Sequence, residues 1–258
     1  GKEIRGNEVG MIFQDPMSSL NPTMKIGNQV AETLIVHRGY KKSLAQARAT
    51  ELLDMVKIPE PKKRANQYPF EFSGGMLQRA MIAMAIACEP KLLIADEPTT
   101  ALDVTIQSEI LELLKEIQSS NGMSIILITH DLGVVANMAD RVLVMYAGRI
   151  VEEGSCHDIF YRSAHPYTLG LKSAMPRNER GKHVDLEPID GSPPDLFNTP
   201  EGCSYSPRCP YSMNLCQAHQ PTKISIGEDH FSECWLHHEE NTTAVASLHY
   251  ASSAKRQK

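Results

Sequence analysis

The chain has 258 residues, with 26 basic and 31 acidic side chains and a formal net charge of −5. Because basic residues are not in excess, this composition argues against a nucleic-acid-binding protein, and the lysine-rich runs at 41–42 and 62–64 read as solvated helix ends. No apolar run approaches the ~20 residues of a membrane-spanning helix, and no signal peptide is recognised at the amino end. We therefore expect a mixed α/β protein of the cytosol that contacts any membrane indirectly.

Residues 28–70 predict a helical arm. Ser43 and Gln46 have capping-box spacing, and a helical apolar face follows until Pro59 ends it. The residues of this face are Leu44, Ala47, Leu52, Met55 and Val56. Ordinary core packing would account for such a face without any binding role.

Ser73-Gly74-Gly75 stands directly before an apolar helix that we expect over residues 76–87. The unpaired N–H groups of a helix start form a seat for an anion, and glycines let the backbone approach a phosphate closely. Ser73 can either cap the helix or donate its hydroxyl to the same phosphate. Taken alone, the tripeptide favours capping.

Residues 92–95 are apolar and end abruptly in Asp96 and Glu97. A buried parallel strand would deliver both carboxylates to the carboxyl edge of a sheet, where ligands of open α/β folds bind. There the first acid can hold Mg²⁺ through water, and the second can align or deprotonate an attacking water. Considered in isolation, the pair is more simply an acidic turn.

The following segments continue the α/β alternation. Residues 104–119 predict an amphipathic helix that stops at Asn121-Gly122. Residues 123–129 predict another strand, and His130 stands at its end before a helix expected from about Asp131. An imidazole that shares an edge with Asp96 and Glu97 can hydrogen-bond a phosphoryl oxygen.

Residues 141–146 and 149–153 predict a hairpin at the edge of this sheet. The composition shifts after Gly154, and four prolines within 188–200 indicate an extended connector. Four cysteines follow, namely Cys203, Cys209, Cys216 and Cys234. Their spacing is that of neither a zinc ribbon nor a ferredoxin, so zinc and a [4Fe–4S] cluster both stay open, while a reducing cytosol disfavours disulfides.

Read together, these motifs resemble the ATP-binding subunits of ABC transporters. The matching residues are the signature motif Ser73, Gly74, Gly75, Met76, Leu77 and Gln78, the Walker B segment at 92–96, the catalytic Glu97, the switch His130, the Q-loop Gln14 and the D-loop ending in Asp103. The sequences of residues 13–22 and 165–168 are similar to those of the oligopeptide and dipeptide importer branch of this family.

The resemblance implies a fold and a set of roles. The fold is the ABC-type P-loop NTPase core with a helical subdomain and a small cysteine-containing carboxyl-terminal extension. The cofactors are ATP and Mg²⁺: Asp96 and Gln14 serve the magnesium shell, Glu97 orients the attacking water, and His130 contacts the γ-phosphate. In the extension, Cys203, Cys209, Cys216 and Cys234 would ligate an iron–sulfur cluster, with zinc as the alternative.

The resemblance also implies partners. Two such subunits face each other as a homodimer or heterodimer, and the signature of one closes over the nucleotide that the other holds. The helical arm and the Gln14 loop would dock on membrane permease subunits. These subunits in turn receive the peptide from an extracytoplasmic peptide-binding protein. The subunit would then lie peripherally at the cytoplasmic face of the cell membrane and drive peptide import.

One motif of the family does not occur in these residues. A Walker A loop reads Gly-x-x-x-x-Gly-Lys-Ser/Thr, but Lys2 is followed by Glu3 and Lys182 by His183. We therefore expect an amino-terminal truncation and negligible ATP hydrolysis by the 258 residues alone. The expected domains are a partial ABC ATPase domain at 1–154 with its arm at about 28–88, a linker and helical segment at 155–200, a cysteine-rich module at 201–238 and a disordered tail at 239–258.

Two alternatives stay open at this point. A non-transport ATPase with the same signature, such as a chromosome-maintenance or ribosome-associated factor, would usually carry long coiled coils or two tandem cassettes, and neither pattern occurs here. A noncatalytic fragment that binds partner subunits is the other alternative. The cargo is not specified, so dipeptides, longer peptides and nickel chelates all stay open.

Overall fold

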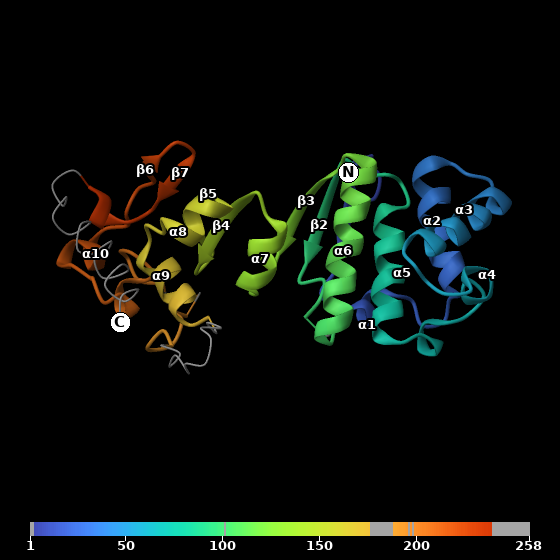
Figure 1. The fold of residues 1–258 in the computed structure, drawn as a ribbon, viewed down its shortest axis with the longest axis horizontal. Helices are drawn as coiled ribbons and strands as arrows, with labels where there is room; N and C mark the ends of the chain where they lie inside the picture. Colours follow the sequence, from blue (N-terminus) through green and yellow to red (C-terminus); the bar gives the residue numbers. More distant parts are fainter. Residues whose placement is uncertain (1–2, 101, 176–187, 196, 198, 239–258) are drawn as a thin grey trace. The chain divides into compact units, whose positions relative to one another are not determined.

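The computed structural model describes residues 3–100, 102–175, 188–195, 197 and 199–238. The chain divides into two compact units, at 1–131 and 132–258, and each is considered by itself (Figure 1). The expected disordered tail at 239–258 lies outside the described residues. Among the described helices, none is both long enough and apolar enough to cross a membrane.

The first unit contains a three-stranded parallel sheet. Its strands are β1 (Val9–Ile12), β2 (Leu92–Asp96) and β3 (Ser124–Ile128), in the order β1-β2-β3. The two strands predicted around 92–95 and 123–129 are thus confirmed, and they are hydrogen-bonded neighbours in which Asp96 pairs with Ile128. Because the strands are parallel, both end at the same edge of the sheet.

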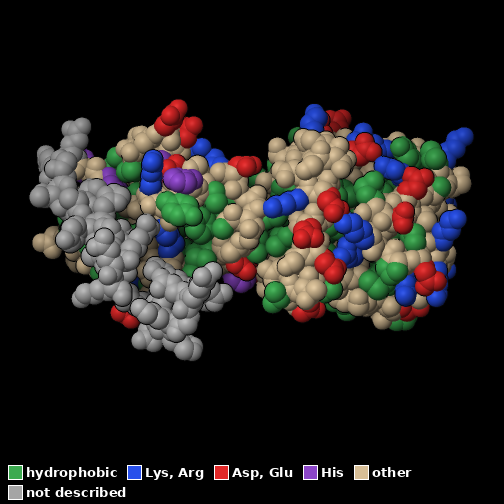
Figure 2. All heavy atoms as spheres, in the orientation of Figure 1, with side chains coloured by type: hydrophobic (Ala, Val, Ile, Leu, Met, Phe, Trp, Pro, Cys, Tyr) green, Lys and Arg blue, Asp and Glu red, His purple; other side chains and the backbone are tan. Residues whose placement is uncertain are grey.

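The predicted arm is helical. It comprises α2 (Ile26–Arg38), α3 (Lys42–Met55) and α4 (Pro61–Arg64), after a short α1 (Pro16–Ser19) and before a 3₁₀ turn, η1 (Pro69–Glu71). Helices α2 and α3 contact each other and α5. In Figure 2 acidic and basic side chains alternate over the visible face of these helices, in keeping with a solvated surface.

Two details of α3 differ from the prediction. The cap of α3 is Lys41, which makes no side-chain capping bond, so Ser43 lies inside the first turn and the capping-box prediction is wrong. Leu44 and Met55 are exposed, whereas the buried face consists of Ala45, Ala49, Leu52, Leu53 and Val56. The small alanines allow α3 to approach its neighbours closely, which a count of large apolar residues does not reveal.

Two long helices complete the first unit. The predicted helices at 76–87 and 104–119 are confirmed as α5 (Gly74–Ile86) and α6 (Val104–Asn121), and Gly122 ends α6 with φ of +64° as expected. Buried Arg79 on α5 donates to the Val56 carbonyl at 3.0 Å and to the Glu109 carboxylate of α6 at 2.7 Å. This side chain ties the arm, α5 and α6 together.

The second unit is built on a four-stranded antiparallel sheet of order β4-β5-β7-β6. The predicted hairpin is confirmed as β4 (Arg141–Tyr146) and β5 (Arg149–Ser155), after α7 (Leu132–Met138). Its expected place at the edge of the parallel sheet is wrong, because the hairpin belongs to a separate sheet, in which β5 pairs with β7 (His230–Ser232) and β7 with β6 (Ile224–Gly227). This long-range pairing has no local sequence signal.

Short helices surround this second sheet. They are α8 (Cys156–Tyr161), α9 (Pro166–Ser173), η2 (Ser206–Arg208), α10 (Asn214–Ala218) and η3 (Trp235–His237). A core of Val142, Val144, Tyr146, Val151, Ile159 and Tyr205 joins the hairpin to α8 and to the cysteine-containing segment. Residues 132–155 and the cysteine region therefore share one core.

Candidate functional site

The carboxyl edge of the parallel sheet carries the first candidate site. Strand β2 ends at Asp96, and the next residue, Glu97, has φ of +43°, a left-handed conformation that costs a non-glycine residue roughly 1–2 kcal/mol. The Glu97 N–H donates to the Ile128 carbonyl of β3 at 2.9 Å, which keeps the turn attached to the sheet. Such strain is typical of positions where a side chain must be aimed.

Three side chains meet at the Glu97 carboxylate, two of them from distant parts of the sequence. The Gln14 amide donates to Oε2 at 2.9 Å, and the Thr100 hydroxyl donates to the same oxygen at 2.8 Å. The His130 ring nitrogen Nδ1 lies 3.1 Å from Oε1. The structure thus brings together Gln14, Glu97 and His130, which the sequence analysis selected from three separate motifs.

These contacts set the charge of the site. Hydrogen bonds from Thr100, then His130 and Gln14, lower the pKa of Glu97 below its ordinary value. The Glu97 side chain is 24% exposed and that of His130 is 72% exposed, so the site opens to solvent. Because Gln14 directs its nitrogen at Glu97, its amide oxygen is left for a cation. With the Asp96 carboxylate, these are oxygen donors of the kind that Mg²⁺ prefers.

Thr100 was missed by the sequence analysis. It lies three residues after Glu97, in a turn where its N–H also bonds the Glu97 carbonyl at 3.3 Å. The available signal was a hydroxyl residue shortly after the acid, but such residues are common in turns. Only the folded turn shows that this one faces the carboxylate.

The signature residues serve local structure in this chain. Ser73 caps α5, and its hydroxyl accepts from the Met76 N–H at 3.4 Å. Asp103 caps α6 in the same way through the Ile106 N–H at 3.0 Å. A side chain on Gly75 would meet Ile106 at 2.9 Å, so this glycine lets α5 and α6 pack closely. Gln78 is buried in α5, and no partner for its Nε2 exists among the described residues.

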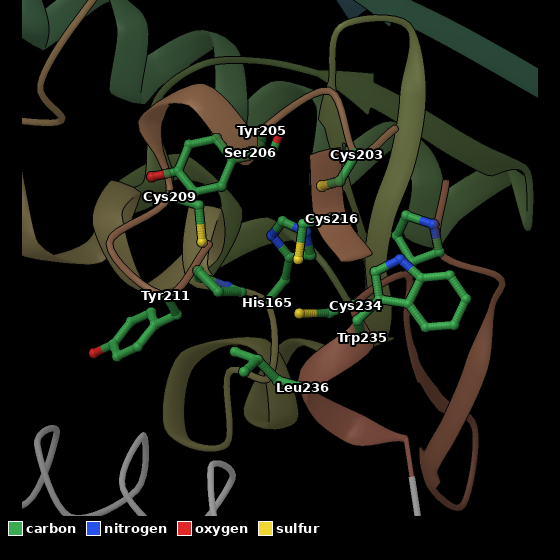
Figure 3. Close-up of a pocket in the computed structure, with 12 residues that line it drawn as sticks. His165, Cys203, Tyr205, Ser206, Cys209, Tyr211, Cys216, Cys234, Trp235 and Leu236 are labelled. Carbon is green, nitrogen blue, oxygen red and sulfur yellow. The ribbon is translucent and has the colours of Figure 1, made fainter. Parts of the chain in front are cut away.

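A second candidate site lies in the other unit. All four cysteines of the carboxyl-terminal segment line one pocket, together with His165, Tyr205 and Trp235. Figure 3 shows the four sulfurs turned toward a common space. The four residues, Cys203, Cys209, Cys216 and Cys234, are all free thiols in this structure. No three metal-ligating side chains among the described residues are placed to hold a single metal ion.

A buried carboxylate organises two walls of this pocket. Glu152 on β5 accepts from the N–H groups of Ala164 and His165 at 2.7 and 2.9 Å, and its Oε1 lies 2.9 Å from Nε2 of His230. Burial by itself would raise the pKa of Glu152, but the hydrogen bond with His230 and those from the backbone outweigh it and lower the pKa. His165 is the N-cap of α9, and Cys234 follows the end of β7 by two residues, so one acid contacts both segments.

Comparison with known proteins identifies the family. The family described as "ABC transporter" matches residues 1–100, and the one described as "Oligopeptide/dipeptide transporter, C-terminal region" matches residues 151–216. The oligopeptide transport ATP-binding protein OppD of Bacillus subtilis is 56% identical over 92% of this chain and 66% of its own length. The dipeptide transport ATP-binding protein DppD of the same organism is 52% identical over 95% of this chain and 72% of its own length.

The chain belongs to the ATP-binding subunits of oligopeptide and dipeptide ABC transporters. OppD of Haemophilus influenzae is similar at 53% identity, over 91% of this chain and 72% of that protein. The chain thus spans 66 to 72% of the length of these curated relatives.

Solved structures confirm the ABC ATPase fold. The ATP-binding cassette MJ0796, a dimer in a post-hydrolysis state bound to ADP and Pi, superposes with a TM-score of 0.52 at 31% identity, over 58% of this chain and 64% of that one. CbiO1 from Clostridium perfringens, part of the ABC transporter complex cbiONQ, gives a TM-score of 0.53 at 31% identity, over 60% of this chain and 61% of that one.

Proposed function

We propose that the subunit containing this chain hydrolyses ATP to power import of oligopeptides or dipeptides. The observation that carries the proposal is the meeting of Gln14, Thr100 and His130 at the Glu97 carboxylate, one residue beyond Asp96 at the end of β2. The similarity to OppD and DppD supports peptides as the cargo class.

The mechanism follows from the charges at this edge. Phosphoryl transfer to water gains most from positioning and charge stabilisation. Glu97, kept ionised by its hydrogen bonds, orients the water and accepts its proton, while the left-handed turn holds the carboxylate in place. The Asp96 carboxylate and the Gln14 amide oxygen would hold Mg²⁺, which when bound would neutralise phosphate charge. His130, beside Glu97, donates to the transferring phosphoryl group.

Besides capping and packing within this chain, the signature residues are proposed to act on a partner subunit. Ser73, Gly74 and Gly75 begin α5, whose unpaired N–H groups attract phosphate. We assign them to the nucleotide held by a second ATP-binding subunit, with Asp103 at the start of α6 and Gln78 supporting the same contact. The helical arm and the loop after Gln14 dock on the permease subunits, which places the protein peripherally at the cytoplasmic face of the membrane.

Reconstitution tests the transport function. The complete subunit, its partner ATP-binding subunit and the permease subunits would be assembled in proteoliposomes with the peptide-binding protein, and ATP hydrolysis and uptake of a labelled peptide measured together. Peptide uptake that requires ATP is the expected result. Co-purification with ribosomes or DNA instead of permease subunits, or hydrolysis without uptake, would favour a non-transport ATPase. Binding to the permease subunits without ATP hydrolysis would favour the alternative of a noncatalytic protein that only binds partner subunits.

For the second unit, we propose that Cys203, Cys209, Cys216 and Cys234 hold a [4Fe–4S] cluster. The donor set fits: four free thiols face one pocket whose walls are otherwise largely aromatic and apolar, and a cluster takes one cysteine on each iron. Zinc, held by four thiolates at about 2.3 Å, is the alternative. The preference for the cluster rests on the resemblance to peptide-importer ATPases. When bound, the cluster would supply redox capacity or cross-link the segments that carry the four cysteines.

Metal analysis separates the two groups. Anaerobically purified protein should contain iron and sulfide and absorb visible light through sulfur-to-iron charge transfer, whereas stoichiometric zinc without iron would refute the cluster. Cys216→Ser should lose the absorbance. Cys156→Ser is the matched control, since Cys156 belongs to the same unit but does not line the pocket.

A further inference from the structure

A second cavity lies in the carboxyl-terminal unit, apart from the cysteine pocket. Its volume is about 440 Å³, within the ~300–1,000 Å³ usual for small-molecule sites. It is lined by the β4–β5 hairpin, by α9, by the proline connector and by η2, chiefly through Met145, Tyr146, Tyr167, Pro193, Pro194 and Arg208. No step of the proposed ATPase mechanism uses these residues.

Arg208 supplies the charge of this cavity. Its guanidinium donates to the carbonyls of Asp190 and Ile189 at 2.8 and 3.0 Å, and to the Tyr146 hydroxyl at 3.3 Å. These three bonds use three of its five N–H donors. Among the described residues, Arg208 makes no ion pair with an acid. A guanidinium held by three hydrogen bonds, with two N–H donors that no described residue accepts from, is suited to bind a carboxylate.

The other walls are mainly apolar and aromatic. The rings of Tyr146 and Tyr167 lie 4.6 Å apart between centroids, and both contact the Tyr205 ring, at 5.2 and 5.4 Å. Pro193, Pro194 and Met145 add flat or flexible apolar surface beside them. Such walls bury an apolar or aromatic group at low entropic cost because the tyrosines are already held in place.

We propose that this cavity binds a small organic carboxylate that carries an apolar or aromatic side chain, the chemistry of the carboxyl-terminal residue of a peptide. Arg208 and the Tyr146 hydroxyl receive the carboxylate, and the tyrosine and proline walls receive the side chain. The simpler role of Arg208 is to clamp the connector through its two carbonyl bonds. If that were its only role, the cavity would bind no small molecule, or would bind charged and neutral ligands equally. A carboxylate-binding site would bind the charged ligand more tightly.

Paired probes make this distinction. N-acetyl-L-phenylalanine and N-acetyl-L-phenylalaninamide differ only in the carboxylate, and both would be titrated calorimetrically into the 258-residue chain without ATP. We expect the acid to bind in the range of ~1 mM or tighter and the amide to bind at least about tenfold more weakly. Equal binding of both probes, no binding of either, or equal binding of inorganic phosphate would overturn the proposal.

A matched pair of variants locates the binding without disturbing the Arg208 clamp. Met145 lines the cavity and is 59% exposed, so it tolerates polar replacement. Met145→Glu places an acid beside Arg208 and should weaken binding of N-acetyl-L-phenylalanine by tenfold or more, while Met145→Gln, of similar size, should keep it within about threefold. Identical affinities of the two variants would show that the ligand binds elsewhere. Because no nucleotide is present, the result does not depend on the proposed transport function.

Discussion

The side-chain amide of Gln14 donates to Glu97 at 2.9 Å, across 83 positions of sequence. Gln14 follows the first strand of the parallel sheet closely and Glu97 follows the second directly, so the bond joins two strand ends. It engages one carboxylate oxygen of Glu97, and His130 contacts the other. A small movement of the Gln14 loop would therefore change the position of the Glu97 carboxylate, the group proposed to orient water.

Replacing the acid tests the proposed chemistry most directly. Glu97→Gln in the complete, assembled subunit should keep nucleotide binding and the closed dimer but lower turnover by about 10²–10⁴-fold, the usual contribution of a general base. Hydrolysis by the reconstituted transporter and retention of bound ATP after gel filtration measure the two effects. Undiminished turnover would remove Glu97 from its assigned role.

Thr100 should control the pH response of the same acid. Its hydroxyl is the leading cause of the lowered pKa of Glu97, so Thr100→Val should raise that pKa toward its ordinary value. An acid with a raised pKa loses its charge at a higher pH as the solution is acidified. We therefore expect the acid limb of the hydrolysis profile to move to higher pH in Thr100→Val and to stay in place in Thr100→Ser. Coincident profiles for the two variants would contradict this.

The two signature glycines should differ in their tolerance of a methyl group. A Cβ on Gly75 would stand 2.9 Å from Ile106, whereas one on Gly74 would have only Leu102, at 3.9 Å, nearby. Gly75→Ala should destabilise the fold by about 1–3 kcal/mol, as overpacking does. Gly74→Ala should be neutral or stabilise by up to about 1 kcal/mol through helix propensity. Thermal unfolding followed by helical circular dichroism compares the two.

A compensating change distinguishes overpacking from a backbone effect at Gly75. Ile106→Ala removes the methyl group that a Gly75 side chain would meet. The double variant Gly75→Ala/Ile106→Ala should therefore lose less stability than the sum of the two single variants. Strictly additive losses would show that the contact between α5 and α6 is not the reason for the glycine.

His165 predicts a pH dependence for the second unit. Burial lowers the pKa of His165 to about 4, whereas an unfolded histidine titrates near ~6.5. Between these values the unfolded chain binds a proton that the folded chain does not, so stability falls as the pH falls through this window, by about 3 kcal/mol at most. His165→Asn keeps an acceptor for the Tyr167 N–H and removes the titration, and should flatten the dependence. Urea unfolding monitored by the single tryptophan, Trp235, measures it, and parallel curves would contradict the prediction.

Local sequence patterns determined the elements and the motifs of this protein. The apolar runs before Asp96 and His130 predicted two parallel strands, and the glycine at 122 predicted a helix stop, because strand burial and left-handed caps depend on neighbouring residues. The same runs indicated that Asp96, Glu97 and His130 would share an edge, and the family resemblance added Gln14 to this site. The family resemblance rested on these motifs, and the relatives confirm it.

Only the tertiary structure decided which side chains meet and how the strands are shared. The Thr100 hydroxyl contacts Glu97 because of the conformation of the turn between them. The Glu152 carboxylate contacts the His230 ring, 78 positions later in the sequence, because β5 pairs with β7. Strand pairing and buried polar networks depend on contacts between segments far apart in the chain, and no periodicity within either segment records them. For the same reason the cysteine spacing left the ligand open, and the convergence of Cys203, Cys209, Cys216 and Cys234 on one pocket became visible only in the folded unit.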